Sequence, residues 1–327
     1  MRRRDLLVGV LAATTTTTLR AAKEQKVHRL AVCSQFGTDS FSKRPWTGLF
    51  ERLPQIGFME GKNLIIDRYA REGHPERYAE IARNIVRTKP DAIALDFDHQ
   101  FILQVAKETA TIPIVAAFGD PVAAGIVKNM ARPEGNITGI SLDAGVETQG
   151  KHLEILRQAV PLASRIAYLS NRAEWEGAWG HAVREAGQRL SVSIIGMPME
   201  RTAEEADYRQ AFEKMEQQSV QALMANGFPP NFQHRELILQ LAIKHRLPSI
   251  TWWPDEGEAF LVYAPDYLHY YRLWADEVGQ VLNGVAPADI PIQQPTKFIL
   301  SLNLKTAEAI GLDVPSTLVL LADRVIE

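Results

Sequence analysis

Short apolar runs of strand length alternate along the first half of the chain with longer segments whose apolar residues recur at helical spacing. The short runs predict strands at residues 29–34, 63–69, 92–95 and 112–118. The longer segments predict helices at 45–57, at 76–88, through Lys107, and from Pro121 onward. Strands and helices that alternate in this way form a parallel, doubly wound sheet with right-handed crossovers.

A second series of the same kind begins with a predicted helix at 147–159. Its predicted strands are 165–170, 193–197, 222–225, 248–252 and 260–263, and its predicted helices are 175–190, 206–217 and 232–245. The same unit is therefore built twice, which predicts an α/β fold of two doubly wound parallel-sheet lobes. In open sheets of this kind, ligands bind beyond the carboxyl ends of the strands.

A polar turn stops the apolar strand at 112–118. Gly119 suits a tight turn, Asp120 is a favoured N-cap residue, and Pro121 suits the first position of a helix. Capping alone is one interpretation of Asp120. Its place at the end of a buried strand also makes it a candidate ligand contact.

Composition adds bounds to this picture. A chain of 327 residues is long for one hydrophobic core, because domains commonly hold about 100–150 residues. The 46% apolar and 23% charged residues are typical of a globular protein, and the net charge of −3 gives no sign of a nucleic-acid partner. Cys33 is the only cysteine, so no disulfide can form within the chain.

The first 22 residues have the pattern of an export signal. Residues 2–4 are arginines, residues 6–13 form a short apolar run, and Ala21 and Ala22 supply small residues for cleavage. The order Arg3-Arg4-Asp5-Leu6-Leu7 fits the twin-arginine route, with a plain secretory leader as the alternative. The apolar run is shorter than the roughly 20 residues that cross a bilayer. We therefore expect a free periplasmic protein with the leader removed.

Several strings along the chain carry a family resemblance. They are TIPIVAAFGDPVAAGIVKNMARPEGNITGIS at 111–141, GFMEGKNL at 57–64, KPD at 89–91, HREL at 234–237, KHRLP at 244–248, QQPTKF at 293–298 and NLKTA at 303–307. Together and in this order, they resemble the solute-binding components of ABC importers of the tryptophan/tyrosine type.

The resemblance implies a type 1 periplasmic binding fold in which the chain crosses between the lobes three times. The implied crossings lie near 141–145, near 263–266 and before Lys297. A helix at 267–282, whose aromatic residues recur at helical spacing, would then return to the first lobe, and residues 298–302 to the second. One lobe would then hold residues 27–143 and about 266–290, and the other 144–265 and about 291–327. The predicted elements alone place a single boundary near residue 145.

Polar and aromatic residues follow the predicted strands of both lobes, as expected for a small-molecule site. In the first lobe the candidates are Ser34, Gln35, Asp39, Asp96, Phe97, Asp98, His99, Gly119 and Asp120. In the second lobe and the hinge they are Asn171 with Trp175, Asn226 with Phe228, Trp252, Trp253, Tyr263 and Asp266. The asparagines alternatively shape turns, and Trp175 with Trp179 alternatively forms a packed helical face.

Two segments depart from the wording of the family. Residues 96–99 read Asp-Phe-Asp-His where the family usually has a small-residue turn, and residues 226–230 read Asn-Gly-Phe-Pro-Pro where an aspartate-proline pair is common. Two aspartates would repel a ligand carboxylate. The hypothesis is that Asp96 or Asp98 holds an ammonium, an amidine or a sugar hydroxyl while an aromatic ring, from Phe97, Phe228 or Trp252, stacks on the ligand.

The sequence gives little support for catalysis. It contains no G-x-S-x-G elbow, no phosphate-binding P-loop, no G-x-G-x-x-G and no H-E-x-x-H, and its 8 histidines form no pair at metal-ligand spacing. We expect no enzyme, no metal and no cofactor.

The predicted function is a periplasmic solute-binding protein of an ABC importer, which holds a small polar or aromatic molecule by closure of two lobes. Its expected partners are that ligand and ABC permease subunits, with the protein itself a monomer. The alternative is a periplasmic sensory receptor that reports to a membrane kinase or chemoreceptor. An enzyme on the same scaffold is the third reading, because fold does not fix function.

Overall fold

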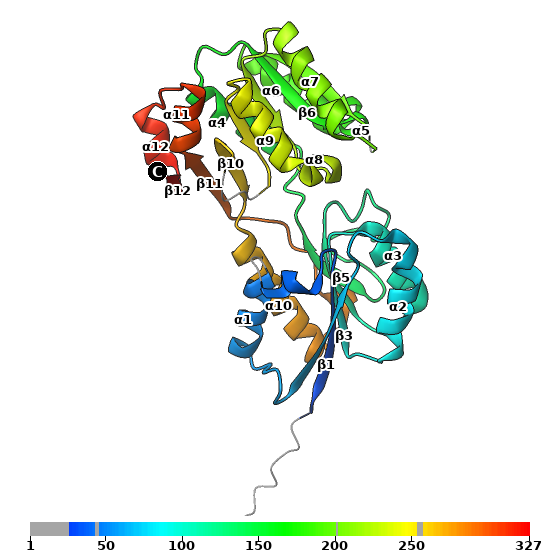
Figure 1. The fold of residues 1–327 in the computed structure, drawn as a ribbon. Coiled ribbons are helices and arrows are strands. Elements are labelled where there is room, and N and C mark those ends of the chain that lie inside the picture. Colours follow the sequence, from blue (N-terminus) through cyan, green and yellow to red (C-terminus); the bar gives the residue numbers. More distant parts are fainter. Residues whose placement is uncertain (1–25, 43–45, 201, 254–257) are drawn as a thin grey trace, which may run out of the picture.

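The computed structural model describes residues 26–42, 46–200, 202–253 and 258–327. The export signal predicted at residues 1–22 lies outside these residues. No helix in the described ranges combines the length and apolar character needed to cross a membrane. Two lobes, each with its own sheet, are arranged one above the other in Figure 1.

The first lobe is built on five parallel strands in the order β2-β1-β3-β4-β5. They are β1 (His28–Ser34), β2 (Leu64–Ala70), β3 (Ala92–Asp96), β4 (Ile114–Phe118) and β5 (Ile137–Ser141). Residues of β3, β4 and β5 are buried throughout, as expected for a sheet covered on both faces.

Helices cover both faces of this sheet. They are α1 (Trp46–Gln55), α2 (Tyr78–Arg87), α3 (His99–Glu108) and α10 (Tyr267–Leu282), with the 3-10 turns η1 (Thr38–Ser42), η2 (Pro75–Arg77) and η3 (Pro287–Asp289). Helix α10 comes from far along the sequence and packs against α1. Its Trp274 is fully buried, and the indole N–H donates to the Val115 carbonyl of β4 at 3.1 Å.

The second lobe is built on seven strands in the order β12-β11-β10-β9-β8-β6-β7, which are parallel except for the β10–β11 pair. They are β6 (Arg165–Asn171), β7 (Ser193–Met199), β8 (Ala222–Ala225), β9 (Ser249–Thr251), β10 (Leu261–Pro265), β11 (Phe298–Asn303) and β12 (Arg324–Ile326). The helices of this lobe are α4 (Thr148–Ala159), α5 (Arg172–Glu176), α6 (Ala178–Arg189), α7 (Glu205–Gln217), α8 (Pro229–Gln233), α9 (Arg235–Lys244), α11 (Leu304–Ile310) and α12 (Ser316–Leu321).

The chain passes between the two sheets three times. It leaves β5 for α4, returns from β10 into α10, and passes once more through residues 293–297 into β11. The third segment hydrogen bonds to the first, because the Ser141 N–H donates to the Gln293 carbonyl at 2.7 Å. The predicted fold class, two doubly wound lobes with a three-crossover hinge, is confirmed.

Three local predictions differ from the structure. The helix predicted from Pro121 is wrong, because Asp120 caps only a single turn and the chain then runs irregularly to β5. The helix predicted at 175–190 is two helices, because Gly177 interrupts it in an extended conformation. The helix predicted at 232–245 begins inside α8 and is interrupted at His234, which separates α8 from α9. Strands β5 and β12 and helices α11 and α12 had no counterpart among the predicted elements.

Gly139 of β5 lies so close to β4 that no side chain fits there. Its φ of +143° lies outside the usual range for residues with side chains, and a Cβ there would stand 1.8 Å from the Ala116 carbonyl oxygen. Gly125 also has a positive φ, but a Cβ there meets nothing within 4 Å. An alanine at Gly125 would therefore add backbone strain alone, whereas an alanine at Gly139 would add a steric collision as well.

Gly139→Ala is expected to lower the free energy of unfolding by at least about 3 kcal/mol, because β4 and β5 must move apart. The control Gly125→Ala bears only the strain of a positive φ, about 1–2 kcal/mol. Urea denaturation followed by circular dichroism measures both. Equal losses in the two variants would contradict the close approach of β5 to β4.

Candidate functional site between the lobes

Loops that follow the carboxyl ends of strands in both sheets meet between the lobes. Phe36, just after β1, lies with its ring centroid 6.4 Å from that of Phe232 in α8 of the second lobe. Phe36 keeps 48% of its surface exposed. The region between these loops is called the interlobe site below.

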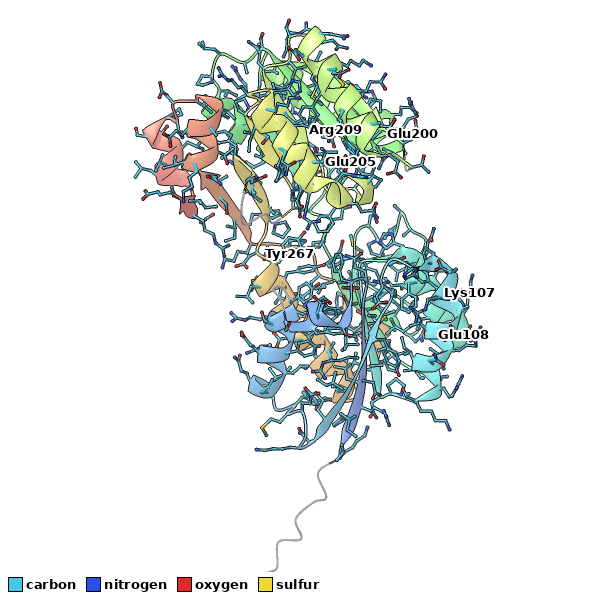
Figure 2. All side chains as sticks on the ribbon, viewed as in Figure 1. Lys107, Glu108, Glu200, Glu205, Arg209 and Tyr267 are labelled. Atoms are coloured by element: carbon cyan, nitrogen blue, oxygen red, sulfur yellow. The ribbon has the colours of Figure 1, made fainter. Side chains whose placement is uncertain are left out.

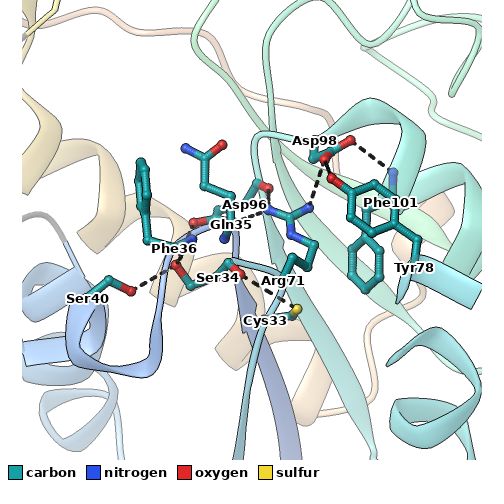
Figure 3. A network of polar contacts seen from close by, with 10 residues as sticks. All are labelled: Cys33, Ser34, Gln35, Phe36, Ser40, Arg71, Tyr78, Asp96, Asp98 and Phe101. Carbon is teal, nitrogen blue, oxygen red and sulfur yellow. Dashed lines mark hydrogen bonds and ion pairs between the residues drawn. The ribbon is translucent and has the colours of Figure 1, made fainter. Parts of the chain in front are cut away.

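A buried arginine organises the first-lobe side of the interlobe site (Figure 3). Arg71, directly after β2, is 0% exposed, and its Nη2 donates to both Oδ1 and the carbonyl oxygen of Asp96 at 2.7 Å. Asp96 also accepts from the Gln35 N–H at 2.8 Å and the Ser34 hydroxyl at 3.4 Å. The Asp96 carboxylate therefore already has a cation and two further donors.

Asp98 and His99 have local partners as well. Asp98 caps α3 by accepting from the Phe101 N–H at 3.0 Å, and it accepts a short hydrogen bond from the Tyr78 hydroxyl. The Gly119 N–H donates to Nε2 of His99 at 3.2 Å, and burial lowers the pKa of this imidazole. These contacts account for residues 98 and 99 without a ligand. Their assignment to a ligand, together with that of Asp96, stays a prediction.

The remaining first-lobe candidates lie around the same loops. Phe97 has a φ of +37° and packs against the hydrophobic core. Asp120 accepts from the N–H groups of Val122 and Ala123, both at 2.9 Å, and so caps the turn after β4. Asp39 is exposed on η1, and the Ser34 hydroxyl accepts from the Phe36 N–H at 3.1 Å.

In the second lobe, two predicted asparagines converge on Glu174. Asn171 caps α5 by accepting from the Glu174 N–H at 2.7 Å, and the Asn226 amide donates a short hydrogen bond to the Glu174 carboxylate. Phe228 is 6% exposed and belongs to the hydrophobic core of this lobe. Asn171 and Asn226 thus both contact Glu174, whereas Phe228 packs in the core of the lobe.

Trp252 is half-buried and stacks on a histidine from α4. Its ring lies 3.8 Å from that of His152 at an interplanar angle of 15°. The two ring nitrogens of His152 face the carbonyl oxygens of Thr148, at 2.8 Å, and Tyr263, at 2.7 Å. Burial lowers the pKa of His152 to about 4, and the two carbonyl contacts act in the opposite direction.

The other tryptophan candidates are structural. Trp253 is 1% exposed and lies in the core of the second lobe. Trp175 fills the space beside Gly196, where a Cβ would come within 2.3 Å of its ring. Trp175 and Trp179 do not share one helix, because Gly177 divides α5 from α6.

The hinge candidates Tyr263 and Asp266 lie where the second crossing meets the third. Asp266 caps α10, accepts from the His269 N–H at 3.2 Å, and pairs with Lys297 at 2.8 Å. The Tyr263 ring stacks on Phe298 with centroids 5.2 Å apart. Tyr267, at the first position of α10, marks this junction in Figure 2.

Five residues near the strand ends and crossings were not among the predicted site residues, namely Arg71, Asp143, Glu147, His152 and Glu174. Arg71 is the second residue after the strand predicted at 63–69, and Glu174 stands three residues after the candidate Asn171, so a search for polar residues near strand ends could have found both. Asp143 lies in the first crossing, where its Oδ1 accepts from the Gly145 N–H at 2.8 Å. Among the described residues, no cluster of histidine, cysteine or carboxylate side chains is arranged to hold a metal ion.

Comparison with known proteins identifies the class. A family model described as ABC transporter substrate binding protein matches residues 29–326. A tyrosine-binding protein of Clostridioides difficile is 30% identical over 128 residues, which are 39% of this chain and 36% of that protein. The match to this curated relative therefore spans about a third of its length.

Solved structures agree on the fold. A conserved domain protein from Vibrio cholerae has a TM-score of 0.78 and 24% identity, with 92% of this chain and 100% of that chain covered. A streptococcal ABC domain in complex with L-Trp has a TM-score of 0.78 and 18% identity over the same shares. A ligand-free, open substrate-binding protein from Clostridium difficile has a TM-score of 0.73 and 20% identity, covering 92% of this chain and 99% of that chain.

Two lobes joined by three crossings, with polar loops meeting between them, define a bilobed solute-binding protein. The chain belongs to the family of ABC transporter substrate-binding proteins, as the resemblance of its sequence indicated. It is a binding protein, and the expectation that it is not an enzyme agrees with its family and fold.

Asp96→Asn is expected to lower the free energy of unfolding by about 3 kcal/mol, because it removes the charge that compensates buried Arg71. The matched control is Asp276→Asn, which breaks a half-exposed pair with Arg52 (2.8 Å). That loss should stay below about 1 kcal/mol. Thermal and urea unfolding measure both variants, and a loss of less than 1 kcal/mol for Asp96→Asn would contradict a structural role for the pair.

Proposed function

We propose that this protein is the solute-binding component of an ABC importer and captures a small molecule by closure of its two lobes. The observation that carries the proposal is the contact of strand-end loops from both sheets, with Phe36 against Phe232 at the mouth of the interlobe site. A ligand held there touches both lobes, so binding favours the closed arrangement.

The proposal includes the division into lobes as the units that move. Residues 27–143 with about 266–290 form one unit, and residues 144–265 with about 291–327 form the other. The ion pair of Asp266 with Lys297, and the hydrogen bond from Gln294 Nε2 to the Asp143 carbonyl at 2.8 Å, cross-link the crossings between them. Closure must therefore bend all three crossings together.

The setting of this function is also proposed. The leader at residues 1–22 directs the chain to the periplasm, by the twin-arginine route, where the mature monomer delivers its solute to ABC permease subunits. The tyrosine- and L-Trp-binding relatives support a small molecule as the solute. The alternative role, a sensory receptor, uses the same closure, and neighbouring genes for a sensor kinase in place of a permease and an ATPase would favour it.

Mature protein purified from its native host is expected to release one bound small molecule when it is denatured and analysed by mass spectrometry. Adding that molecule back to the emptied protein, at about a hundredfold excess over its Kd, should stabilise the fold by about 2.7 kcal/mol through mass action. Differential scanning calorimetry measures this gain.

Lysozyme carried through the same release and add-back steps is the control for adventitious binding. The molecule should be recovered unchanged after incubation with the protein. Conversion of the molecule to a product would overturn the binding role, and a protein that neither releases nor binds any small solute would overturn the importer proposal.

A further inference from the structure

Acidic residues from both lobes and the first crossing lie close enough to influence one another electrostatically. Asp120 follows β4, Asp143 and Glu147 lie in the first crossing, and Glu174 lies in α5 after β6. The pKa of Asp143 is raised first by burial and then by the charges of Asp120 and Glu147. The pKa of Glu174 is raised by burial and, more weakly, by the charge of Asp143. The carboxylates are therefore close enough to repel one another.

These charges are not neutralised by the protein. Among the described residues, no lysine, arginine or histidine forms an ion pair with Asp143 or Glu174. The described partners of the two carboxylates are neutral, namely the Gly145 N–H for Asp143 and the Asn226 amide for Glu174. The interlobe site thus concentrates negative charge in a partly dehydrated space.

The buried hydroxyl of Tyr168 lies near Glu174 and lacks a hydrogen-bond partner of standard geometry within the described ranges. Tyr168, in the middle of β6, is 0% exposed, and its Oη has no hydrogen bond of standard geometry among the described residues. Burial raises the pKa of this hydroxyl, the charge of Glu174 raises it further, and the neighbouring Asn226 amide lowers it. Buried hydroxyl groups usually have a hydrogen-bond partner, and a ligand group bound beside Glu174 could donate a hydrogen bond to this one.

An aromatic surface adjoins this polar group. The ring of half-buried Trp252 lies 6.3 Å from that of Tyr168, and its other neighbour is the stacked His152 ring. Aromatic rings of this kind favour ammonium and guanidinium groups over anions. Negative charge, an acceptor hydroxyl and an aromatic ring all suit a positively charged group.

We propose that the solute is a net cation, whose ammonium, amidinium or guanidinium group Glu174 and Asp143 hold together between the lobes. The inference rests on the proposed function, since it specifies the chemical class of the solute. It also moves the cation-binding role from Asp96 and Asp98, which have structural partners, to two carboxylates that have no cation of their own. Closure brings the cation to both carboxylates at once, so the charge of the ligand helps to join the lobes.

The test is isothermal titration calorimetry of the mature protein with named probes of each charge class. The cationic probes are putrescine, spermidine, agmatine, benzamidine, tryptamine and tyramine. The comparison probes are zwitterionic L-tryptophan and L-tyrosine, anionic indole-3-propionate, and neutral myo-inositol. At least one cationic probe should bind, and indole-3-propionate and myo-inositol should not. Glu174→Gln should weaken the best cation by at least about 30-fold, as expected when one partner of a desolvated charge pair is removed.

Glu176→Gln is the matched control, because Glu176 lies in the same helix, 63% exposed beside Arg172, and its loss should change affinity by less than about twofold. Asp143→Asn should weaken the same cation by at least about tenfold and provides the test if Glu174→Gln does not fold.

The outcomes separate the two proposals. Binding of only neutral, anionic or zwitterionic probes overturns the cationic class and leaves the binding function standing. A cation whose affinity is unchanged by both variants overturns the assignment to Glu174 and Asp143. Failure of every probe to bind, by a protein that also releases no solute, overturns both the cationic class and the importer proposal.

Discussion

The direction of the strands is the constraint on which the rest of the molecule depends. All five strands of the first sheet are parallel, and the strands of the second sheet that contribute candidate ligand contacts, β6, β8, β9 and β10, are parallel to one another as well. In each sheet the carboxyl ends of these parallel strands therefore lie along one edge. The three crossings connect the lobes so that the two edges face the same space. Phe36 meets Phe232 only because both follow strand ends that point into the same space.

The polar residues at these edges fall into two groups with different roles. In one group the buried charges are paired with each other, as in Arg71 and Asp96, which form a 2.7 Å ion pair while the Gln35 N–H donates to Asp96, even though Nε and Nη1 of Arg71 have no hydrogen-bond partner among the described residues. The other group, around Glu174 and Tyr168, retains charge or hydrogen-bonding capacity that the described residues do not use. Ligand binding between the lobes depends on the second group, while the first holds the loops in place.

Much of the fold could be predicted from the sequence, because buried strands and amphipathic helices leave strong local patterns. Strands β1 to β4 and helix α10 were predicted within two residues of their ends. The helix predicted from Pro121 is wrong for a local reason, since Gly125 has a φ of +68°, outside the helical range, and ends the turn that Asp120 caps. Gly177 divides the helix predicted at 175–190, because its extended backbone ends the hydrogen bonding of α5 and caps the start of α6.

The candidate site was harder to predict, because its roles depend on contacts between distant segments. The sequence placed Asp96 and Asp98 at a strand end, but nothing local indicated that Arg71, 25 residues earlier, would pair with Asp96. Asn171 and Asn226 were chosen as separate candidates, and only the fold brings them to the same carboxylate of Glu174. Asp143 was overlooked because a crossing between lobes has no periodic pattern of its own.

The central claim is that a solute bound between the lobes draws them together. Lys107 and Glu205 lie on exposed helices of different lobes (Figure 2), and the native Cys33 is buried, so spin labels can be placed at Lys107→Cys and Glu205→Cys. Pulsed electron paramagnetic resonance should give a shorter and narrower distance distribution after the co-purified solute is added. An unchanged distribution with the solute demonstrably bound would contradict the account.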